Sequence, residues 1–454
     1  MAQNTLLTRS LGPWQAASIV VGTIIGTGIF LKTATMTQLV GSMPAVMAAW
    51  VVSGILSYAG TLTYAELSAR FPSSGGEYVF LREAYGSLPA FLYGWMRFLV
   101  GSPGSIAAYA VGSATFAAGL GLFRAEQVPG GAPAVAVCLI VFFSLLNCLQ
   151  IRWGARAQML LTILKCGLIL ALIAGVAVFG KSPETILQAA GAVTGRPWYS
   201  AFGLAMIAAL WAFDGWNNLP MIGEEVSEPR KNLPLALALG MLAVMALYLS
   251  ANWAYFHILS IAEIQGANST AHPGALPVAT LAAKAFLGKT GVPVLSAAFV
   301  ISALGAMNGS ILSCARVPFA MARDGVFFRG LAHIAPNAHV PVRAVLLQCV
   351  IASVLALSGT FDQLTDWVVV CGWTFYALCI STLFVFRKRD GAAPPDGFRV
   401  PGFPCLPVMF IAAALLLIAN SLWNNPRAGL FGGLLVAAGF PFYLWMKRSP
   451  QPGA

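Results

Sequence analysis

The stretch VGTIIGTGIF, residues Val21–Phe30, places three glycines in the middle of the first long apolar segment of the chain. A later apolar segment contains ALWAFDGWNNLP, residues Ala209–Pro220, with an acid, a glycine and a proline at a similar depth. Glycine and proline weaken a helix. An acid inside an apolar segment costs free energy, so its presence indicates a functional site. The sequence therefore predicts two membrane helices that are each broken near the middle.

The composition around these stretches is that of a polytopic membrane protein. Of 454 residues, 58% are hydrophobic and 9% are charged, whereas about 25% of residues are charged in ordinary soluble proteins. Segments of about 20 apolar residues are long enough to cross a bilayer. Because these segments are continuously apolar, without alternation at period two, we expect helices and not a β-barrel. Twelve such segments are predicted, at residues 13–40, 43–69, 88–118, 133–151, 157–180, 200–223, 234–258, 291–322, 341–358, 364–386, 404–424 and 428–446.

The two broken segments are the first and the sixth. Breaks that are five segments apart are what an inverted five-helix repeat gives. We expect a single transmembrane transporter domain over residues 1–454, with repeat one at about 13–180, repeat two at about 200–390, and two further helices at about 404–446. The alternative is that Gly22 and Gly26 form a close-packing motif between helices, but that leaves Asp214 unexplained.

The charges predict the orientation in the membrane. The chain has 26 Lys and Arg against 15 Asp and Glu, for a net charge of +11. If the N-terminus is cytoplasmic, seventeen of the basic residues lie at the inner side, six lie in outer loops and three lie inside predicted spans. Cytoplasmic loops carry the excess of Lys and Arg. Both termini are therefore expected in the cytoplasm, and nucleic acid is not an expected partner.

A broken membrane helix is a candidate binding site. Unwinding frees backbone N–H and C=O groups that hydrocarbon cannot satisfy. The N–H groups of Gly26, Thr27 and Gly28 would begin a half-helix, where they favour a carboxylate. The carbonyl groups that would favour an ammonium ion are those of Thr23, Ile24, Trp211 and Asp214. The two sets together suit an amino acid.

Four motifs resemble those of the amino acid, polyamine and organocation (APC) transporter superfamily. They are similar above all to its L-amino-acid transporter branch, which contains bacterial exchangers and the light chains of animal heteromeric transporters. The resemblance covers about residues 10–390 and implies a LeuT-type fold of five plus five helices with helices one and six broken. The motifs are GTIIGTGIF, TYAELSARFPSSGGEYVFLREAYG, WAFDGWN followed by GEEVSEPRKNLP, and ALGAMNGSILSCARVPFAMARDGVFF.

The resemblance also implies which residues bind the substrate. Gly26, Thr27 and Gly28 would hold its carboxylate, and carbonyls around Ile24, Trp211 and Asp214 would hold its amine. Trp211 would close over the substrate from outside, unless it is simply a core aromatic.

Lys165 is a second candidate functional residue. It lies nine residues after Arg156, which is about 13 Å along a helix. In sodium-coupled relatives of this fold a cation sits between helices one and eight. The resemblance implies that the ammonium group of Lys165 takes that place, near carbonyls around Gly22 and hydroxyls of Ser310 or Ser313. The alternative is a lysine that is paired elsewhere or faces an aqueous vestibule.

Asp214 has three possible roles at this stage. It could cap the second half of the 200–223 segment, contact the amine or side chain of the substrate, or carry a proton. The small residues near the breaks mildly favour neutral substrates, while Asp214 leaves cationic ones open.

These features predict a sodium-independent L-amino-acid transporter, an exchanger that works by alternating access in a bacterial inner membrane. The alternative is a proton-coupled amino acid symporter with Asp214 as the main proton carrier. A membrane enzyme is far less favoured, since no H-E-x-x-H or G-x-S-x-G motif is present. We expect no cofactor and no metal. Lipid and a small-molecule amino acid are the expected partners, without a disulfide-linked heavy chain, because the loop Gly119–Ala132 contains no cysteine.

Overall fold

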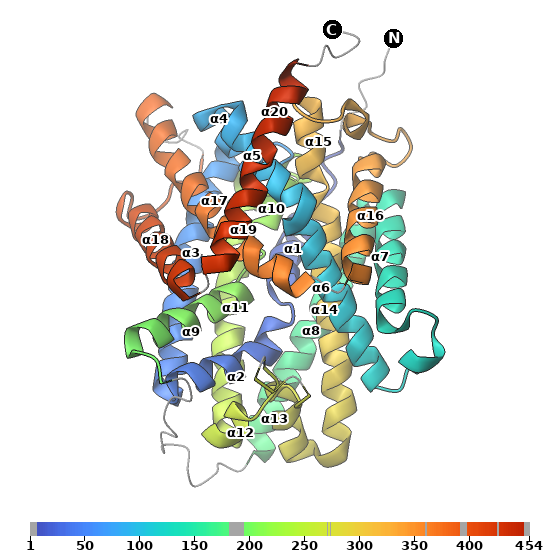
Figure 1. Cartoon of the computed structure of the whole chain (residues 1–454), viewed down its shortest axis with the longest axis vertical. Helices are drawn as coiled ribbons and strands as arrows, with labels where there is room; N and C mark the ends of the chain where they lie inside the picture. The colour runs from blue at the N-terminus through green and yellow to red at the C-terminus, as the bar shows by residue number, and fades with distance from the viewer. Residues whose placement is uncertain are drawn as a thin grey trace.

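The computed structural model describes the chain as a helical bundle (Figure 1). Besides helices, the described part of the chain contains two isolated β-bridges, which join Leu11 to Val226 and Ser74 to Ile222. Residues 1–6 and 449–454 of the predicted domain lie outside the described residues. The described ranges are 7–180, 195–269, 271–272, 274–358, 361–390, 397–424 and 426–448.

The helices range in length from four residues in α10 to thirty in α11. In chain order the main ones are α1 (Pro13–Ile24), α2 (Gly28–Val40), α3 (Met43–Arg70), α4 (Glu77–Tyr85), α5 (Ser87–Met96), α6 (Ser102–Gly119), α7 (Gly131–Leu149), α8 (Ile151–Phe179), α9 (Trp198–Ala212), α10 (Asn218–Met221), α11 (Pro229–Ile258), α12 (Ile261–Gln265), α13 (Val278–Leu287), α14 (Gly291–Cys314), α15 (Arg316–Arg323), α16 (Val342–Ser358), α17 (Phe361–Asp390), α18 (Cys405–Asn424), α19 (Pro426–Ala437) and α20 (Gly439–Arg448).

Helices occupy all twelve predicted apolar segments. Among the described residues, eight stretches are long and apolar enough to cross a membrane, and α9 and α16 are shorter apolar helices. The eight stretches are Pro13–Val40, Met43–Arg70, Gly131–Leu149, Ile151–Phe179, Pro229–Ile258, Val278–Arg323, Cys405–Asn424 and Gly429–Lys447. The chain is thus an all-helical polytopic membrane protein, while twelve crossings and an inverted repeat remain predictions.

Both predicted helix breaks are present. The first helix stops at Ile24 and resumes as α2 at Gly28, and the second stops at Ala212 and resumes as the short α10. Gly215 lies in the second break with φ +119°, a conformation that favours glycine. A Cβ on Gly215 would lie 2.8 Å from the carbonyl oxygen of Thr23, whose hydroxyl donates a 2.9 Å hydrogen bond to the Gly215 carbonyl. The two breaks are therefore in direct contact.

The packing around α1 places the breaks in the interior. Helix α1 packs against α8, α11 and α14, while α11 packs against α3, and α14 packs against α6. Figure 1 shows α4, α15 and α20 at one end of the bundle, here called the terminal end because both termini lie there, and α2, α12 and α13 toward the other. Helix α2 packs closely on α9, since a Cβ on Gly28 would lie 2.6 Å from the Cβ of Ala212.

A third irregularity was not predicted from the sequence. Between α5 and α6 the residues Arg97–Gly101 form a single turn of π-helix. Pro103 follows it, and a proline ring in a regular helix clashes with the carbonyl four residues earlier, here that of Leu99. The widened turn relieves this conflict, and turns of this kind are frequent at functional sites. It re-aims Arg97, which the sequence left without a partner.

Candidate functional site

Lys165 lies beside the first helix break and is fully buried, with 0% of its side chain exposed. Its ammonium group donates hydrogen bonds to the carbonyl oxygens of Gly22 at 2.7 Å, Ile25 at 2.5 Å and Ser302 at 3.2 Å. An ammonium group has three donors. All three are therefore used, and one cation joins α8 to the unwound end of α1 and to α14. We call these three carbonyls and Lys165 the Lys165 site.

The predicted hydroxyl partners of Lys165 are not among its contacts in the described part of the chain. The Ser313 hydroxyl donates to the carbonyl of Gly309 at 2.7 Å, and Ser310 lines a cavity described below. Ser302, about two to three helical turns earlier on α14, contributes its backbone carbonyl instead. Its hydroxyl donates to the carbonyls of Ile25 at 3.1 Å and Gly26 at 2.9 Å.

Gly305 makes room for the lysine. A Cβ at this position would lie 2.8 Å from Nζ of Lys165 and 2.9 Å from its Cε. Gly22 is similarly enclosed, because its Cβ would lie 2.3 Å from the hydroxyl of Thr162. The Lys165 site is thus tightly packed as well as fully hydrogen-bonded.

The carbonyl of Ile24 is held by another distant side chain. The hydroxyl of Tyr248 on α11 donates to it at 3.1 Å and also to the carbonyl of Ala212 at 3.1 Å, which ties the two breaks together. The Ile24 carbonyl also accepts from the N–H of Gly26 at 2.8 Å. A carbonyl has two lone pairs, so Ile24 could hold a substrate amine only by releasing one of these partners.

The predicted carboxylate-binding residues lie together in the first break. Because the Gly26 N–H already donates to Ile24, the free donors left here are those at the start of α2, where the first N–H groups have no intrahelical partner. Thr27 is the N-cap of α2 and Gly28 is its first residue. Tyr109 on α6 faces this point, since a Cβ on Gly26 would lie 3.1 Å from its ring.

Next to the breaks lie two neighbouring cavities, of about 60 Å³ and about 20 Å³. Both are lined by Arg97, Ser105 and Asp214, and we call them together the Arg97–Asp214 cavity. The larger is also lined by Tyr93, Met96, Gly101, Leu210, Trp211, Gly372, Trp373 and Tyr376. The smaller is also lined by Thr23, Ser102, Tyr109, Gly215, Asn217, Asn218, Ser310 and Cys314.

Asp214 is exposed to this cavity although it lies within the bundle. Its Oδ1 accepts a 2.6 Å hydrogen bond from the hydroxyl of Tyr376 on α17. It does not cap α10, whose N-cap is Asn217 without a side-chain capping bond. The capping role is therefore not supported, and the carboxylate faces a space that a ligand or water can enter.

Arg97 reaches the same space from the π-helical turn. Its Nη2 lies 3.4 Å from Oδ1 of Asn218 and 3.6 Å from Sγ of Cys314. Its Nε is buried without a hydrogen-bond partner in the described part of the chain. The guanidinium thus has long contacts and spare donors, unlike the ammonium of Lys165.

Trp211 lies at the edge of the cavity next to α2. The ammonium group of Lys32, on α2, stands over the indole ring at 4.4 Å from its centroid. Such a contact between a cation and an aromatic face is attractive. It gives Lys32 a contact within its segment and holds the indole ring of Trp211 against α2.

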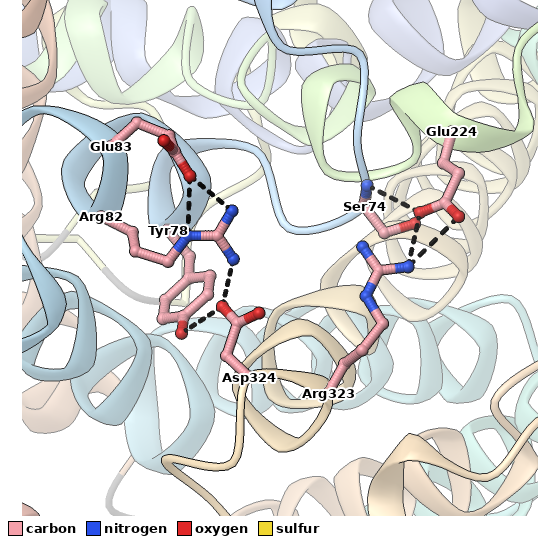
Figure 2. A network of polar contacts seen from close by, with 7 residues as sticks. All are labelled: Ser74, Tyr78, Arg82, Glu83, Glu224, Arg323 and Asp324. Carbon is pink, nitrogen blue, oxygen red and sulfur yellow. Dashed lines mark hydrogen bonds and ion pairs between the residues drawn. The ribbon is translucent and has the colours of Figure 1, made fainter.

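The terminal end of the bundle is joined by ion pairs (Figure 2). Arg82 on α4 pairs with Asp324 after α15, and the hydroxyl of Tyr78 donates to the same carboxylate at 2.8 Å. Burial and the nearby Asp324 carboxylate raise the pKa of Tyr78, so its hydroxyl stays protonated as a donor. Arg323 pairs with Glu224 at 3.0 Å, and this carboxylate also accepts the N–H of Ser74 at 3.2 Å.

A deeper ion pair supports this network. Arg316 and Glu225 are 1% and 0% exposed and form two hydrogen bonds, at 2.8 Å and 3.1 Å. Planar two-point pairing of this kind holds geometry as well as charge. Helix α4, the turn Gly223–Glu225 and α15 are therefore linked at the terminal end.

Several of these residues could not be identified from the sequence. Ser302, Tyr248 and Tyr376 are polar residues in apolar helices, and each acts on backbone or side chains more than 30 positions away. The motif Gly101-Ser-Pro103 after Arg97 is the one local signal that could have indicated an irregular turn.

Known proteins are similar in sequence to this chain over nearly its whole length. The sequence profile of a family described as amino acid permease matches residues 11–440. The serine/threonine exchanger SteT of Bacillus subtilis (strain 168) is 31% identical over 97% of this chain and 98% of its own length. The cystine/glutamate transporter of Homo sapiens is 30% identical over 98% of this chain and 87% of its own, and the b(0,+)-type amino acid transporter 1 of Mus musculus is 28% identical over 99% and 92%.

Proposed function

Because the chain belongs to the amino acid permease family of the APC superfamily, we propose that it is a sodium-independent L-amino-acid exchanger. The family and its relatives are transporters and not enzymes. Substrate would bind at the membrane midplane between the two helix breaks, with its carboxylate next to Gly26 at the free N–H groups of Thr27 and Gly28 and its amine near Trp211 and Asp214. Alternating access would expose this site to each side of the membrane in turn.

The observation that supports sodium independence is the Lys165 site. Unwound backbone carbonyls of broken helices are the groups that coordinate sodium in sodium-coupled transporters. Here the carbonyls of Gly22, Ile25 and Ser302 all accept from one buried ammonium group. A sodium ion at this point would lose its ligands to the lysine and would be repelled by its charge. The protein therefore contains its own cation.

Alternating access is supported by the two kinds of closure at the ends of the bundle. The packing of α2 against α9 closes the side of the breaks away from the termini, and the pairs Arg82–Asp324 and Arg323–Glu224 close the terminal end by charge. Exposed ion pairs contribute little stability, typically 0 to about 1 kcal/mol. They can therefore open and re-form during transport.

Exchange is supported by the functions of the relatives. SteT is described as an exchanger of serine and threonine, and another relative as a transporter of cystine and glutamate. These substrates differ in charge and size, so the similarity to these relatives does not identify the substrate class of this protein. The excess of basic residues predicted for the inner side supports cytoplasmic termini. In a bacterial inner membrane the chain would act without a disulfide-linked heavy chain.

Uptake of labelled L-amino acids into sodium-free proteoliposomes tests this function. Vesicles preloaded with unlabelled amino acids are compared with empty vesicles at the same pH, and with preloaded vesicles in sodium buffer. An exchanger takes up label only into preloaded vesicles and at the same rate in both buffers. Uptake that requires sodium would refute the role proposed for Lys165.

The same vesicles separate exchange from proton symport. Asp214 is exposed to the cavity, so a proton can reach it, and this is the observation that favours the symport alternative. Accumulation in empty vesicles that is driven by an inward proton gradient and abolished by an uncoupler would establish symport in place of exchange. Equal uptake into empty and preloaded vesicles without a gradient would indicate a uniporter.

A further inference from the structure

The charges that line the Arg97–Asp214 cavity carry information about the substrate that the similarity to relatives does not. We propose that this cavity receives the side chain of the transported amino acid and selects side chains that are short, uncharged and able both to donate and to accept hydrogen bonds. Hydroxyl and carboxamide side chains share this chemistry. The inference rests on the proposed function, because it names the substrate class of the same site.

Arg97 supplies the donors. A guanidinium group has five N–H donors and no acceptor. The contacts of Arg97 with Asn218 and Cys314 are long, at 3.4 Å and 3.6 Å, and its Nε has no partner among the described residues. An oxygen atom of a substrate side chain would complete the hydrogen bonding of this group.

Asp214 supplies the acceptor. An ionised carboxylate has about four lone-pair sites, and the hydroxyl of Tyr376 uses one of them at Oδ1. The side chain is exposed to the cavity. A hydroxyl or amide N–H of the substrate would find an acceptor there, opposite the donors of Arg97.

The two charges also exclude charged side chains. Arg97 and Asp214 line both cavities, so their charges cancel within one small space. A cationic side chain that pairs with Asp214 is held beside Arg97, and an anionic one that pairs with Arg97 is held beside Asp214. A like charge at close range is strongly unfavourable in a site of low dielectric constant. A charged side chain of either sign is therefore attracted by one of these residues and repelled by the other.

Glu77 is the other acid in this region, and it does not change the balance. It is 0% exposed, is absent from the lining of both cavities, and accepts a 2.7 Å hydrogen bond from Asn217. Burial raises the pKa of Glu77 above its ordinary value, and the nearby Arg97 opposes this shift. Because Glu77 does not line either cavity, the charged side chains that face a substrate side chain are those of Arg97 and Asp214.

Size and shape limit the side chain further. The cavity volumes are about 60 Å³ and about 20 Å³, and the larger cavity is bounded by the rings of Tyr93, Trp211, Trp373 and Tyr376. An apolar side chain of the same size would leave the donors of Arg97 and the acceptor of Asp214 unpaired. Sites built to hydrogen-bond a substrate reject the analogue that lacks the bonding group for this reason.

The first test uses pairs of amino acids that have nearly the same shape. Threonine is compared with valine, and asparagine with leucine and with aspartate, as competitors of labelled uptake by the wild-type protein in preloaded vesicles. We expect threonine and asparagine to compete at concentrations about tenfold or more below those of their partners. Valine that competes as well as threonine would overturn the inference while leaving amino acid exchange intact.

The second test changes one charge at a time. Asp214→Asn leaves the positive charge of Arg97 without an opposite charge in the cavity. Acidic amino acids should therefore compete for uptake better, relative to threonine, than they do with the wild-type protein. Arg97→Gln leaves the negative charge of Asp214 without an opposite charge, so lysine and arginine should compete for uptake better relative to threonine. The double variant is neutral again and should restore the preference for uncharged side chains. Lys289→Gln, at an exposed residue far from the cavity, controls for a change of charge alone.

The outcomes of the second test are distinct from a general loss of activity. Selectivity is the ratio of two substrates measured on the same vesicles, so a fall in the amount of folded protein cancels. If both single variants keep the wild-type order of substrates, the cavity does not select by charge and the inference is wrong. If the wild-type protein exchanges no amino acid at all, the proposed function itself has failed.

Discussion

The Lys165 site and the Arg97–Asp214 cavity lie beside the same pair of helix breaks, yet they treat buried charge in opposite ways. Lys165 uses all three of its donors on carbonyls of Gly22, Ile25 and Ser302. Arg97 has long contacts and one donor, Nε, without a partner among the residues that the structure describes, and Asp214 faces open space. The charge of Lys165 is enclosed by protein atoms, whereas Arg97 and Asp214 have hydrogen-bonding groups left for water or a ligand.

This difference indicates how a charge in a membrane protein can be assigned a role. A buried charge whose partners are all protein atoms stabilises one arrangement of helices, and removing it leaves those partners unsatisfied. A charge that is only partly bonded and faces a cavity contributes less to stability and more to ligand binding. The predictions below test this distinction by changing one contact at a time in each region, from the largest expected effect on stability to the smallest.

Replacing Lys165 by methionine should have the largest effect. The stem keeps a similar length, but three buried carbonyls lose this donor. The carbonyl of Ile25 keeps the hydroxyl of Ser302, and each group left unsatisfied costs about 1–3 kcal/mol. We expect the apparent unfolding temperature in detergent to fall clearly and sodium-free exchange to fall by about tenfold or more. The control is Lys289→Met at an exposed position. Wild-type activity in Lys165→Met would show that the enclosed charge is dispensable.

Gly305→Ala should be the next most damaging change. The added Cβ would lie 2.8 Å from Nζ and 2.9 Å from Cε of Lys165, so the ammonium group must move away from its carbonyls. Overpacking of this kind typically costs about 1–3 kcal/mol. Thermal unfolding and exchange rate are the measurements. Gly167→Ala on α8, with open space around its Cβ, is the matched control, and equal effects of the two changes would contradict the tight packing of the site.

Ser302→Ala removes the hydroxyl that bonds the carbonyls of Ile25 and Gly26. A single hydrogen bond contributes about 0.5–1.5 kcal/mol, and the lysine still holds Ile25. We therefore expect a smaller fall in unfolding temperature than for Gly305→Ala. Ser353→Ala provides the comparison, because the Ser353 hydroxyl has no partner within the described residues. The idea is wrong if both serine variants unfold at the same temperature.

Tyr376→Phe should scarcely change stability. Its hydroxyl donates to Asp214 at 2.6 Å, but water in the cavity can replace that bond, so we expect less than about 1 kcal/mol. The effect should appear instead as a change of at least about threefold in the apparent KM for the preferred substrate, because the carboxylate is no longer oriented. Tyr58→Phe on α3 is the control. A large loss of stability with an unchanged KM would show that Tyr376 and Asp214 have a structural role, as Lys165 does, and not a role in substrate binding.

The sequence predicted both breaks correctly because their cause is local. Glycines at 22, 26 and 28 and the Asp-Gly pair at 214 and 215 weaken the helix wherever it lies. The same holds for the all-helical membrane class, which follows from composition, and for the family, which follows from four motifs in order and is confirmed by the match over residues 11–440.

The partners of those breaks could not be predicted in the same way. The resemblance suggested Ser310 or Ser313 for Lys165, whereas the structure gives the carbonyl of Ser302. These serines share one helix, and their spacing along it does not say which turn faces α1. The π-helical turn at Arg97–Gly101 adds a further rotation, which brings Arg97 to the cavity of Asp214.

The sequence by itself determined that this chain is a helical membrane transporter with two interrupted helices and a lysine, an arginine and an aspartate inside apolar segments. The tertiary structure decided which of these charges is enclosed and which is open. Partners more than 100 residues apart, such as Ile25 with Lys165 and Tyr376 with Asp214, meet only through helix rotation and packing. Those depend on the sum of many weak contacts across the bundle, and no local pattern of residues records that sum.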